Sequence, residues 1–242
     1  MASPLVDYCE QANPGVLAEI RRFGAFGHAR RIQASFLAKL EKRTLIWLAE
    51  RTPARINSDH LTILGFMGQL LAGGFYAMSR WNKYCLLAVI GCLAVNWLGD
   101  SLDGTLARVR QQQRPRYGFY VDHMVDSIGA VAMMGGLAFS GFMDPWIAIG
   151  LLMAFLVLSI QSYLATYTTG EFRLSFWYFG PTELRLLLAV GNLAVLRWPL
   201  VLHRHYRLFD VGGAVGVIGM TLMLIAFTIK NGYQLYRAER IR

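Results

Sequence analysis

The chain has 242 residues, of which 55% are apolar and 16% charged, and its mean hydropathy is +0.38. A soluble domain carries about a quarter of charged residues, so this composition excludes an ordinary soluble protein and indicates an integral membrane protein. The net charge of +9 comes from basic residues spread over the ends of apolar segments. In a nucleic-acid-binding protein the basic residues would form one dense patch. We therefore expect these residues to contact anionic membrane lipids, and we expect no nucleic-acid partner.

The first expected element is an amphipathic helix at about 36–51. Its apolar residues share one helical arc, whereas Lys39, Lys42 and Arg43 fall elsewhere. This pattern is typical of a helix that lies in the membrane interface, and a helix of a small soluble domain is the alternative interpretation. We assign residues 1–57 to a cytoplasmic N-terminal segment that contains this helix, and residues 58–242 to one membrane domain.

Six apolar segments of membrane-spanning length follow along the chain. They lie at roughly 60–79, 84–107, 118–140, 145–168, 182–202 and 209–230. A spanning helix needs about 20 apolar residues, so the predicted fold is an all-α membrane protein with six transmembrane helices. With the N-terminus inside, 19 of the 24 Lys and Arg residues fall on the cytoplasmic side. Cytoplasmic loops carry an excess of these residues, so both termini are expected in the cytoplasm.

The second and third predicted spans carry four aspartates at helical spacing: Asp100, Asp103, Asp122 and Asp126. Residues three or four apart share one face of a helix, so two helices joined by a short turn would point these carboxylates at one another. An ionised Asp within a membrane helix costs roughly 2.5–3.5 kcal/mol. A divalent cation would offset that cost, and hard oxygen ligands suit Mg²⁺ or Mn²⁺. The alternative is that some of the acids are protonated or reach the membrane surface.

The complete pattern is Asp-x2-Asp-Gly-x2-Ala-Arg, a gap of nine residues, and Gly-x3-Asp-x3-Asp. It resembles the signature of the CDP-alcohol phosphotransferase family. Its eight fixed positions are Asp100, Asp103, Gly104, Ala107, Arg108, Gly118, Asp122 and Asp126. The resemblance implies that the four aspartates bind one or two divalent metals and that Asp126 is also the general base. It further implies that Gly104, Ala107 and Gly118 let the nucleotide approach, and that Arg108 helps to bind phosphate.

Further candidate contacts flank these two spans. Asn57 and Thr62 resemble a feature that opens the first span in this family and contacts the nucleotide, although Asn57 is also an ordinary helix N-cap. The end of the fourth span and the start of the fifth hold the candidates for binding the acceptor or its phosphate: Tyr163, Arg173, Glu183 and Arg185. This region partly resembles choline and ethanolamine phosphotransferases, with Tyr163 where their histidine base is expected. Interfacial charges at a helix start are the alternative interpretation of Glu183 and Arg185.

These features predict an enzyme that transfers a substituted phosphate group from a CDP-alcohol to an acceptor alcohol, with release of CMP, in phospholipid biosynthesis. CDP-diacylglycerol is the first choice of donor. The alternative is a choline/ethanolamine-phosphotransferase-like enzyme with a CDP-headgroup donor and a diacylglycerol acceptor. A cation-coupled membrane carrier is the alternative of another class, because intramembrane acids also relay cations. We expect a homodimer by family analogy, in the plasma membrane of a prokaryote, with the active site facing the cytoplasm.

Overall fold

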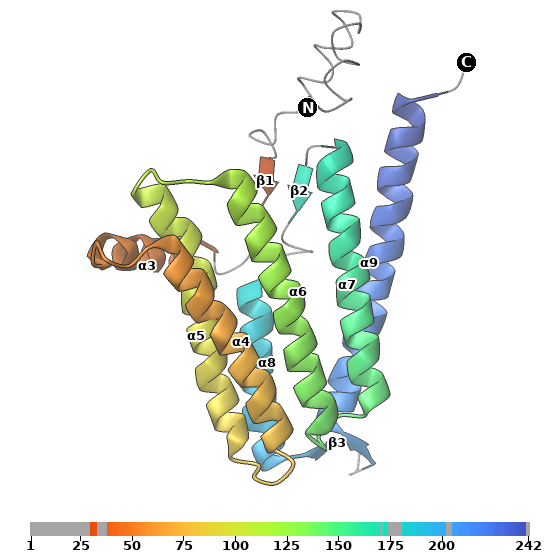
Figure 1. Cartoon of the computed structure of the whole chain (residues 1–242). Helices are drawn as coiled ribbons and strands as arrows, with labels where there is room; N and C mark the ends of the chain where they lie inside the picture. The colour runs from red at the N-terminus through yellow and green to blue at the C-terminus, as the bar shows by residue number, and fades with distance from the viewer. Residues whose placement is uncertain (1–29, 33–37, 170, 174–180, 202–204, 241–242) are drawn as a thin grey trace, which may run out of the picture.

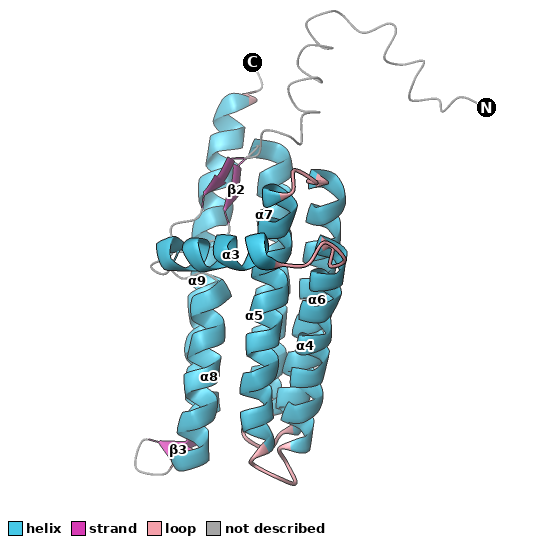
Figure 2. Ribbon diagram, turned by 90° about the vertical axis from the view of Figure 1, so that its left-hand side faces the viewer, coloured by secondary structure: helices cyan, strands magenta, loops and turns pink. Residues whose placement is uncertain are grey.

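The structure is a computed structural model that describes residues 30–32, 38–169, 171–173, 181–201 and 205–240. Within these ranges the chain forms seven helices: α3 (Ala38–Arg51), α4 (Ser58–Met78), α5 (Cys85–Val109), α6 (Pro115–Phe139), α7 (Pro145–Thr169), α8 (Pro181–Arg197) and α9 (Leu208–Ala238). Helices α4 to α9 run up and down in one bundle, and α3 lies across it near one end (Figure 1, Figure 2). The predicted helical bundle and the helix before it are therefore present.

Two small pairs of strands lie in the connections of this helical fold. β1 (Arg30–Ile32) pairs in parallel with β2 (Glu171–Arg173), and β3 (Leu200–Val201) pairs antiparallel with β4 (Tyr206–Arg207). The sequence predicted an all-α fold, which holds for the bundle and not for these connections. Adjacent connecting segments form such pairs because each then satisfies the backbone hydrogen bonds of the other.

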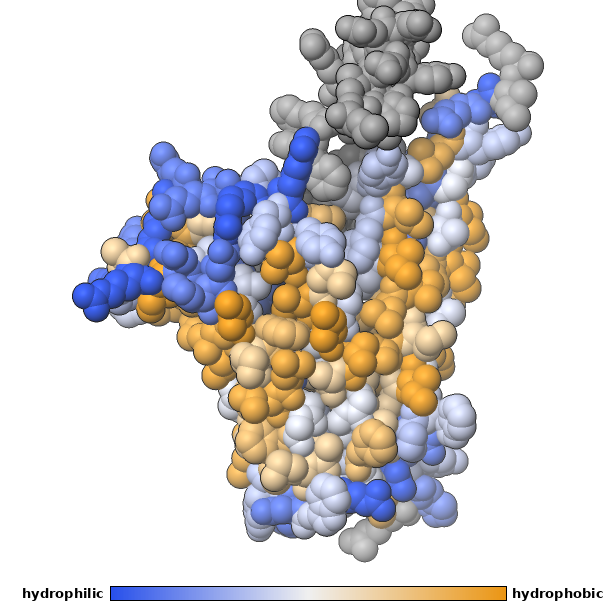
Figure 3. All heavy atoms as spheres, in the orientation of Figure 1, coloured by the Kyte–Doolittle hydropathy of each residue, from blue (hydrophilic) through white to orange (hydrophobic). Residues whose placement is uncertain are grey.

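Four of the described helices are long and apolar enough to cross a membrane: α4, α5, α7 and α9. Of the other two helices in the bundle, α6 carries Asp122 and Asp126 among its 25 residues, and α8 has only 17 residues. Exposed apolar residues cover the middle of the bundle on the face shown in Figure 3, and polar residues gather at its two ends. The protein is a membrane protein, as its composition predicted.

The last two helices end at other residues than the sequence predicted. The fifth predicted span, 182–202, is a helix only as far as Arg197, because Trp198 precedes a proline and such residues are disfavoured in the helical conformation. The sixth, 209–230, continues as a helix to Ala238. The last residues of α9 are mostly polar. The length of an apolar segment predicts which part of a helix lies in lipid, and the helix can continue beyond it into water.

Helix α4 packs closely against both α5 and α6 through glycines. A Cβ atom at Gly99 of α5 would overlap the backbone of Gly65, and a Cβ at Gly136 of α6 would overlap the carbonyl of Gly73. Small residues let membrane helices approach in this way. Helix α4 therefore brings together the two helices that carry the four aspartates.

Helix α3 is anchored on α4 and α5 by apolar and polar contacts. Its Leu45 and Ala49 are buried in one cluster with three leucines of α4 and α5: Leu61, Leu102 and Leu106. At the end of α5, Arg110 donates hydrogen bonds of 2.6–3.0 Å to three carbonyls of the loop after α3: those of Thr52, Pro53 and Ile56. The position of α3 is thus fixed relative to the helix that carries Asp100 and Asp103.

Candidate active site

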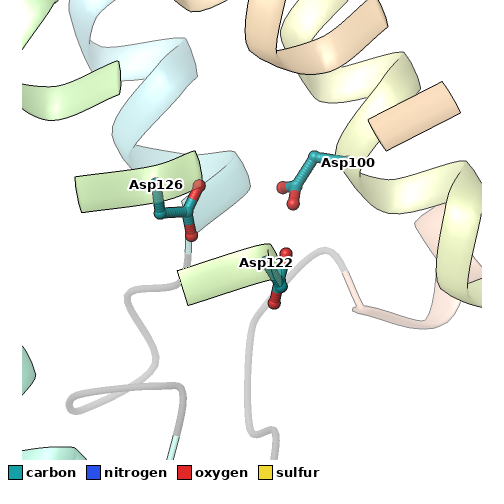
Figure 4. A group of neighbouring side chains, drawn as sticks. All are labelled: Asp100, Asp122 and Asp126. Carbon is teal, nitrogen blue, oxygen red and sulfur yellow. The ribbon is translucent and has the colours of Figure 1, made fainter. Parts of the chain in front are cut away.

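Three carboxylates meet between α5 and α6. Asp100 comes from α5, and Asp122 and Asp126 lie one helical turn apart on α6. One carboxylate oxygen of each residue lies within 4.8 Å of the other two, and the three side chains face one another (Figure 4). All three residues are partly buried. The helical spacing in the sequence predicted that four carboxylates would converge, and three of them do.

The fourth aspartate, Asp103, is held against α4. Its Oδ2 accepts a hydrogen bond from Thr62 Oγ1 at 2.6 Å, and its Oδ1 accepts one from the backbone N–H of Gly104. The carbonyl of Asp103 also accepts a hydrogen bond from Ser58 Oγ at 3.1 Å. Asp103 is therefore outside the group of three carboxylates, and α4 determines where its carboxylate lies.

Arg185 brings α8 into contact with the same site. Its Nη2 donates to Asp100 Oδ2 at 2.6 Å and its Nε donates to Asn96 Oδ1 at 2.7 Å. Asn96 is buried and donates in turn to the carbonyl of Gly65 at 3.0 Å. Asn96 and Asp100 lie one turn apart on α5, so the planar guanidinium that spans them restricts the orientation of the Asp100 carboxylate.

A second buried amide lies next to Asp126. Gln69 of α4 is 7% exposed, and its Nε2 lies 3.5 Å from Asp126 Oδ1. Gly129, one turn further along α6, leaves the space that the Gln69 side chain occupies. Gln69 Oε1 has no hydrogen-bond partner among the described residues. The amide is thus a polar group placed at the site, in a helix that is otherwise largely apolar.

A cleft of about 450 Å³ lies between the start of α4 and the turn that joins α5 to α6. Its lining residues are Asn57, Ser58, Asp59, Leu106, Ala107, Arg110, Gln112, Gln113 and Arg114. Two of the predicted nucleotide contacts, Asn57 and Ala107, are among them. Asn57 is also the N-cap of α4, and its backbone N–H donates to His60 Nδ1 at 3.1 Å.

The remaining predicted nucleotide contacts lie close to this end of the bundle. Arg108 is exposed, and its Nη2 donates to Thr105 Oγ1 at 3.0 Å. Gly118 is exposed near the start of α6, where an added Cβ would meet no atom within 4 Å. An added Cβ at Gly104 would meet only the Arg108 side chain, at 3.6 Å. The glycine positions therefore border open space, as a substrate-binding surface requires.

The predicted acceptor contacts are spread over α7, β2 and α8. The ring of Tyr163 stacks on His123 of α6 with a centroid distance of 4.7 Å, and both rings contact Phe119, at centroid distances of 6.2 and 4.1 Å. Glu183 lies in the first turn of α8, two positions before Arg185, which contacts Asp100. Arg173 is the last residue of β2, opposite Ile32 of β1.

Three polar residues at the site were missed by the sequence analysis: Glu41, Gln69 and Asn96. Gln69 and Asn96 are polar residues within apolar helices, and this signal marks functional positions in membrane proteins. Glu41 lies on α3 among other charged residues and gives no such signal. Its Oε1 nevertheless accepts hydrogen bonds from Trp97, Ser101 and Thr182.

The set of donor atoms fits a hard divalent cation. Three carboxylates offer oxygen ligands within a small volume, and oxygen ligands are those preferred by Mg²⁺ and Mn²⁺. Among the described residues, the Arg185 guanidinium forms an ion pair with Asp100 and the His123 imidazole lies 3.4 Å from Asp122. One guanidinium does not offset three carboxylates. Like charges at this distance repel one another strongly in a partly buried site, so a cation would stabilise the arrangement.

The fold and the site together define a helical membrane protein. Toward one end of its bundle, three clustered carboxylates could bind a cation that binds phosphate groups. The family model of CDP-alcohol phosphatidyltransferases matches residues 56–229, and the chain belongs to this family. It is therefore a membrane transferase of phosphate-containing groups in phospholipid synthesis, with a CDP-alcohol and an acceptor alcohol as substrates. No curated protein matches the chain.

Proposed function

We propose that the protein transfers the substituted phosphate group of CDP-diacylglycerol to a small polar alcohol and releases CMP. The observation that carries this proposal is the convergence of Asp100, Asp122 and Asp126 toward the end of the bundle that also holds the cleft. These three residues and Asp103 would hold Mg²⁺ or Mn²⁺. When bound, such a cation neutralises the pyrophosphate and the charge that develops on the leaving phosphate.

In the proposed reaction the acceptor oxygen attacks the phosphorus distal to the cytidine. A new P–O bond forms there, the bond to the bridging oxygen breaks, and that oxygen leaves as part of CMP. The hydroxyl proton of the acceptor passes to the Asp126 carboxylate, which acts as general base. The amide of Gln69 lies 3.5 Å from that carboxylate. Reactions of this type depend mainly on positioning and on charge neutralisation.

We assign the cytidine and its phosphates to the cleft and its border. Asn57 and Ala107 line the cleft, and the exposed Arg108 follows Ala107 directly in the chain. Gly104 and Gly118 give room for the nucleotide, and Thr62 orients Asp103. The acceptor would approach from α7, β2 and α8, which carry the candidate contacts Tyr163, Arg173, Glu183 and Arg185. An arginine suits a phosphate on the acceptor because its fork donates two parallel hydrogen bonds.

The proposed arrangement in the membrane has six spanning helices, α4 to α9, with α3 in the cytoplasmic interface. Residues 1–57 would form the cytoplasmic segment and residues 58–242 the membrane domain, with both termini in the cytoplasm. Exposed apolar residues on one side of α9 support a lipid-facing surface: Val215, Ile218, Leu222, Ile225 and Ile229. We further propose a homodimer in the plasma membrane of a prokaryote, with the active site open to the cytoplasm.

The proposal is tested by CMP release from purified protein in lipid nanodiscs. CDP-diacylglycerol is offered with a panel of polar alcohols in the presence of Mg²⁺ or Mn²⁺, and CDP-choline with diacylglycerol is offered in parallel. We expect release with CDP-diacylglycerol and one of the alcohols. Asp126→Asn is expected to lower the rate at least about 100-fold, the lower bound for loss of a general base.

Asp144→Asn is the matched control for this experiment. Asp144 lies in the loop between α6 and α7, and its Oδ1 accepts a hydrogen bond from the backbone N–H of Trp146, which an asparagine oxygen also accepts. This variant is expected to keep the wild-type rate. Release only with CDP-choline and diacylglycerol would establish the reversed donor. Failure to bind either CDP-alcohol with Mn²⁺ present would refute the proposed function.

A further inference from the structure

One carboxylate oxygen of Glu41, on α3, accepts hydrogen bonds from two other helices near the candidate site. Glu41 Oε1 accepts hydrogen bonds from Trp97 Nε1 at 3.0 Å, from Ser101 Oγ at 3.2 Å and from Thr182 Oγ1 at 2.8 Å. Trp97 and Ser101 lie one turn apart on α5, and Thr182 lies at the start of α8. Hydrogen bonds to an ionised carboxylate are stronger than those between neutral groups, so this contact firmly connects α3, α5 and α8.

The Glu41 contacts lie next to the contacts of Arg185 on both helices. On α8, Thr182 and Arg185 are three positions apart and so share one face. On α5, Trp97 and Ser101 directly follow Asn96 and Asp100, the two partners of Arg185. The first turn of α8 is therefore held against α5 by two neighbouring sets of polar contacts, and one of them contains a carboxylate of the site.

Anchoring of α3 does not by itself account for Glu41. The apolar cluster that contains Leu45 and Ala49 and the contacts of Arg110 already fix α3 on α5. What Glu41 adds is the connection to α8 through Thr182. Helix α8 is short, and its Arg185 has to reach two acceptors at 2.6 and 2.7 Å, so a small displacement of its first turn would break this contact.

We propose that Glu41 is a positioning residue for the Asp100 carboxylate, acting through Thr182 and Arg185, and this inference rests on the proposed function. Glu41 holds the first turn of α8, α8 holds the Arg185 guanidinium, and the guanidinium holds Asp100 in the orientation that leaves its other oxygen available to a cation. Groups that orient the ligands of a metal in this way change its affinity by about 10- to 100-fold when they are removed.

The test measures Mn²⁺ binding by electron paramagnetic resonance on the full chain in nanodiscs, without substrate. Glu41→Ala is expected to weaken Mn²⁺ binding about tenfold. Glu41→Gln is expected to retain binding close to that of the wild type, because an amide oxygen still accepts these hydrogen bonds. Glu50 lies on the same helix and is exposed, so Glu50→Ala is the matched control and is expected to leave Mn²⁺ binding unchanged.

A second variant and a second measurement separate positioning from folding. Thr182→Val removes the hydroxyl that binds Glu41 and leaves the contacts between α3 and α5 in place, and it too is expected to weaken Mn²⁺ binding. Spin labels at the exposed positions Val95 of α5 and Leu184 of α8, introduced as cysteines after replacement of the native cysteines, report the distance between the helices. We expect a broader distance distribution in both variants than in the wild type.

Two outcomes would overturn the inference about Glu41 and leave the proposed metal site standing. The first is Mn²⁺ binding within twofold of the wild type in both Glu41→Ala and Thr182→Val. The second is a loss in Glu50→Ala as large as that in Glu41→Ala. If the wild-type protein bound no Mn²⁺, or if Asp100→Asn bound it as well as the wild type, the proposed metal site would fail and the inference with it. The wild-type and Asp100→Asn samples therefore distinguish the two failures.

Discussion

Asp103 differs from the other three aspartates in that a hydroxyl of another helix holds its carboxylate. Thr62 Oγ1 lies 2.6 Å from Asp103 Oδ2. Thr62→Val removes this donor and keeps the shape of the side chain, so the carboxylate gains rotational freedom. We expect the rate of CMP release to fall about tenfold, and the Mg²⁺ or Mn²⁺ concentration needed for half-maximal rate to rise.

Thr62→Ser keeps a hydroxyl at this position and is expected to restore most of the wild-type rate. Thr221→Val is the control for a Thr-to-Val change in another membrane helix, because Thr221 is exposed on α9. A Thr62→Val enzyme with an unchanged cation requirement would show that the hydroxyl does not orient Asp103 for a metal.

The residues of the site fall into two groups by how far the sequence could predict them. Asp100 and Asp103, and likewise Asp122 and Asp126, stand three or four residues apart, so helical periodicity alone brings each pair to one face. The partners of Glu41 and Arg185 depend on tertiary packing: Thr182 and Glu41 are 141 positions apart, and Arg185 and Asp100 are 85 apart. Nothing in the local sequence specifies such contacts.

The bounds of a helix could be predicted wherever its apolar segment and the helix itself end at nearly the same residues. The predicted spans at 60–79, 84–107 and 145–168 agree with α4, α5 and α7 within two residues at each end. Helix α6 begins three residues before the predicted 118, at Pro115, a residue type favoured at the first helical position. The helix predicted before the first span is present as Ala38–Arg51, and predicted residues 36–37 lie outside the described part of the chain.

The packing of α4 on α6 gives a prediction with a matched control in the neighbouring residue. A Cβ at Gly73 would overlap the Ala132 carbonyl of α6, whereas a Cβ at Gly74 would meet no atom within 4 Å. Both Gly-to-Ala changes gain similar helix propensity, so the difference in stability between the two variants measures the effect of helix packing. We expect Gly73→Ala to be less stable than Gly74→Ala by about 1–3 kcal/mol, the usual cost of overpacking.

Thermal unfolding of the two variants in nanodiscs measures this difference. The same comparison is available on α6, where a Cβ at Gly136 would overlap Gly73 and a Cβ at Gly135 would meet no atom within 4 Å. Equal unfolding temperatures within each pair would show that α4 and α6 do not pack as closely in the membrane as they do in the structure.

The cleft and the carboxylates of the candidate site lie toward one end of the bundle. The turn from α5 to α6 and the end of α9 lie at this end (Figure 1), and α3 crosses the bundle near it (Figure 2). The nucleotide and the cations are soluble and reach the site from water, while a diacylglycerol chain needs lipid. A site at the end of the apolar bundle gives access to both.

The excess of Lys and Arg on one side of the membrane then predicts that this end faces the cytoplasm. Single cysteines test the orientation in right-side-out vesicles after replacement of Cys9, Cys85 and Cys92. A membrane-impermeant maleimide is expected to label Asn82→Cys, in the turn between α4 and α5, without permeabilisation. Gln112→Cys, in the turn between α5 and α6, is expected to react only once the vesicles are opened. The reverse pattern would place the site outside the cell, away from the cytoplasmic CDP-alcohols that the proposed reaction consumes.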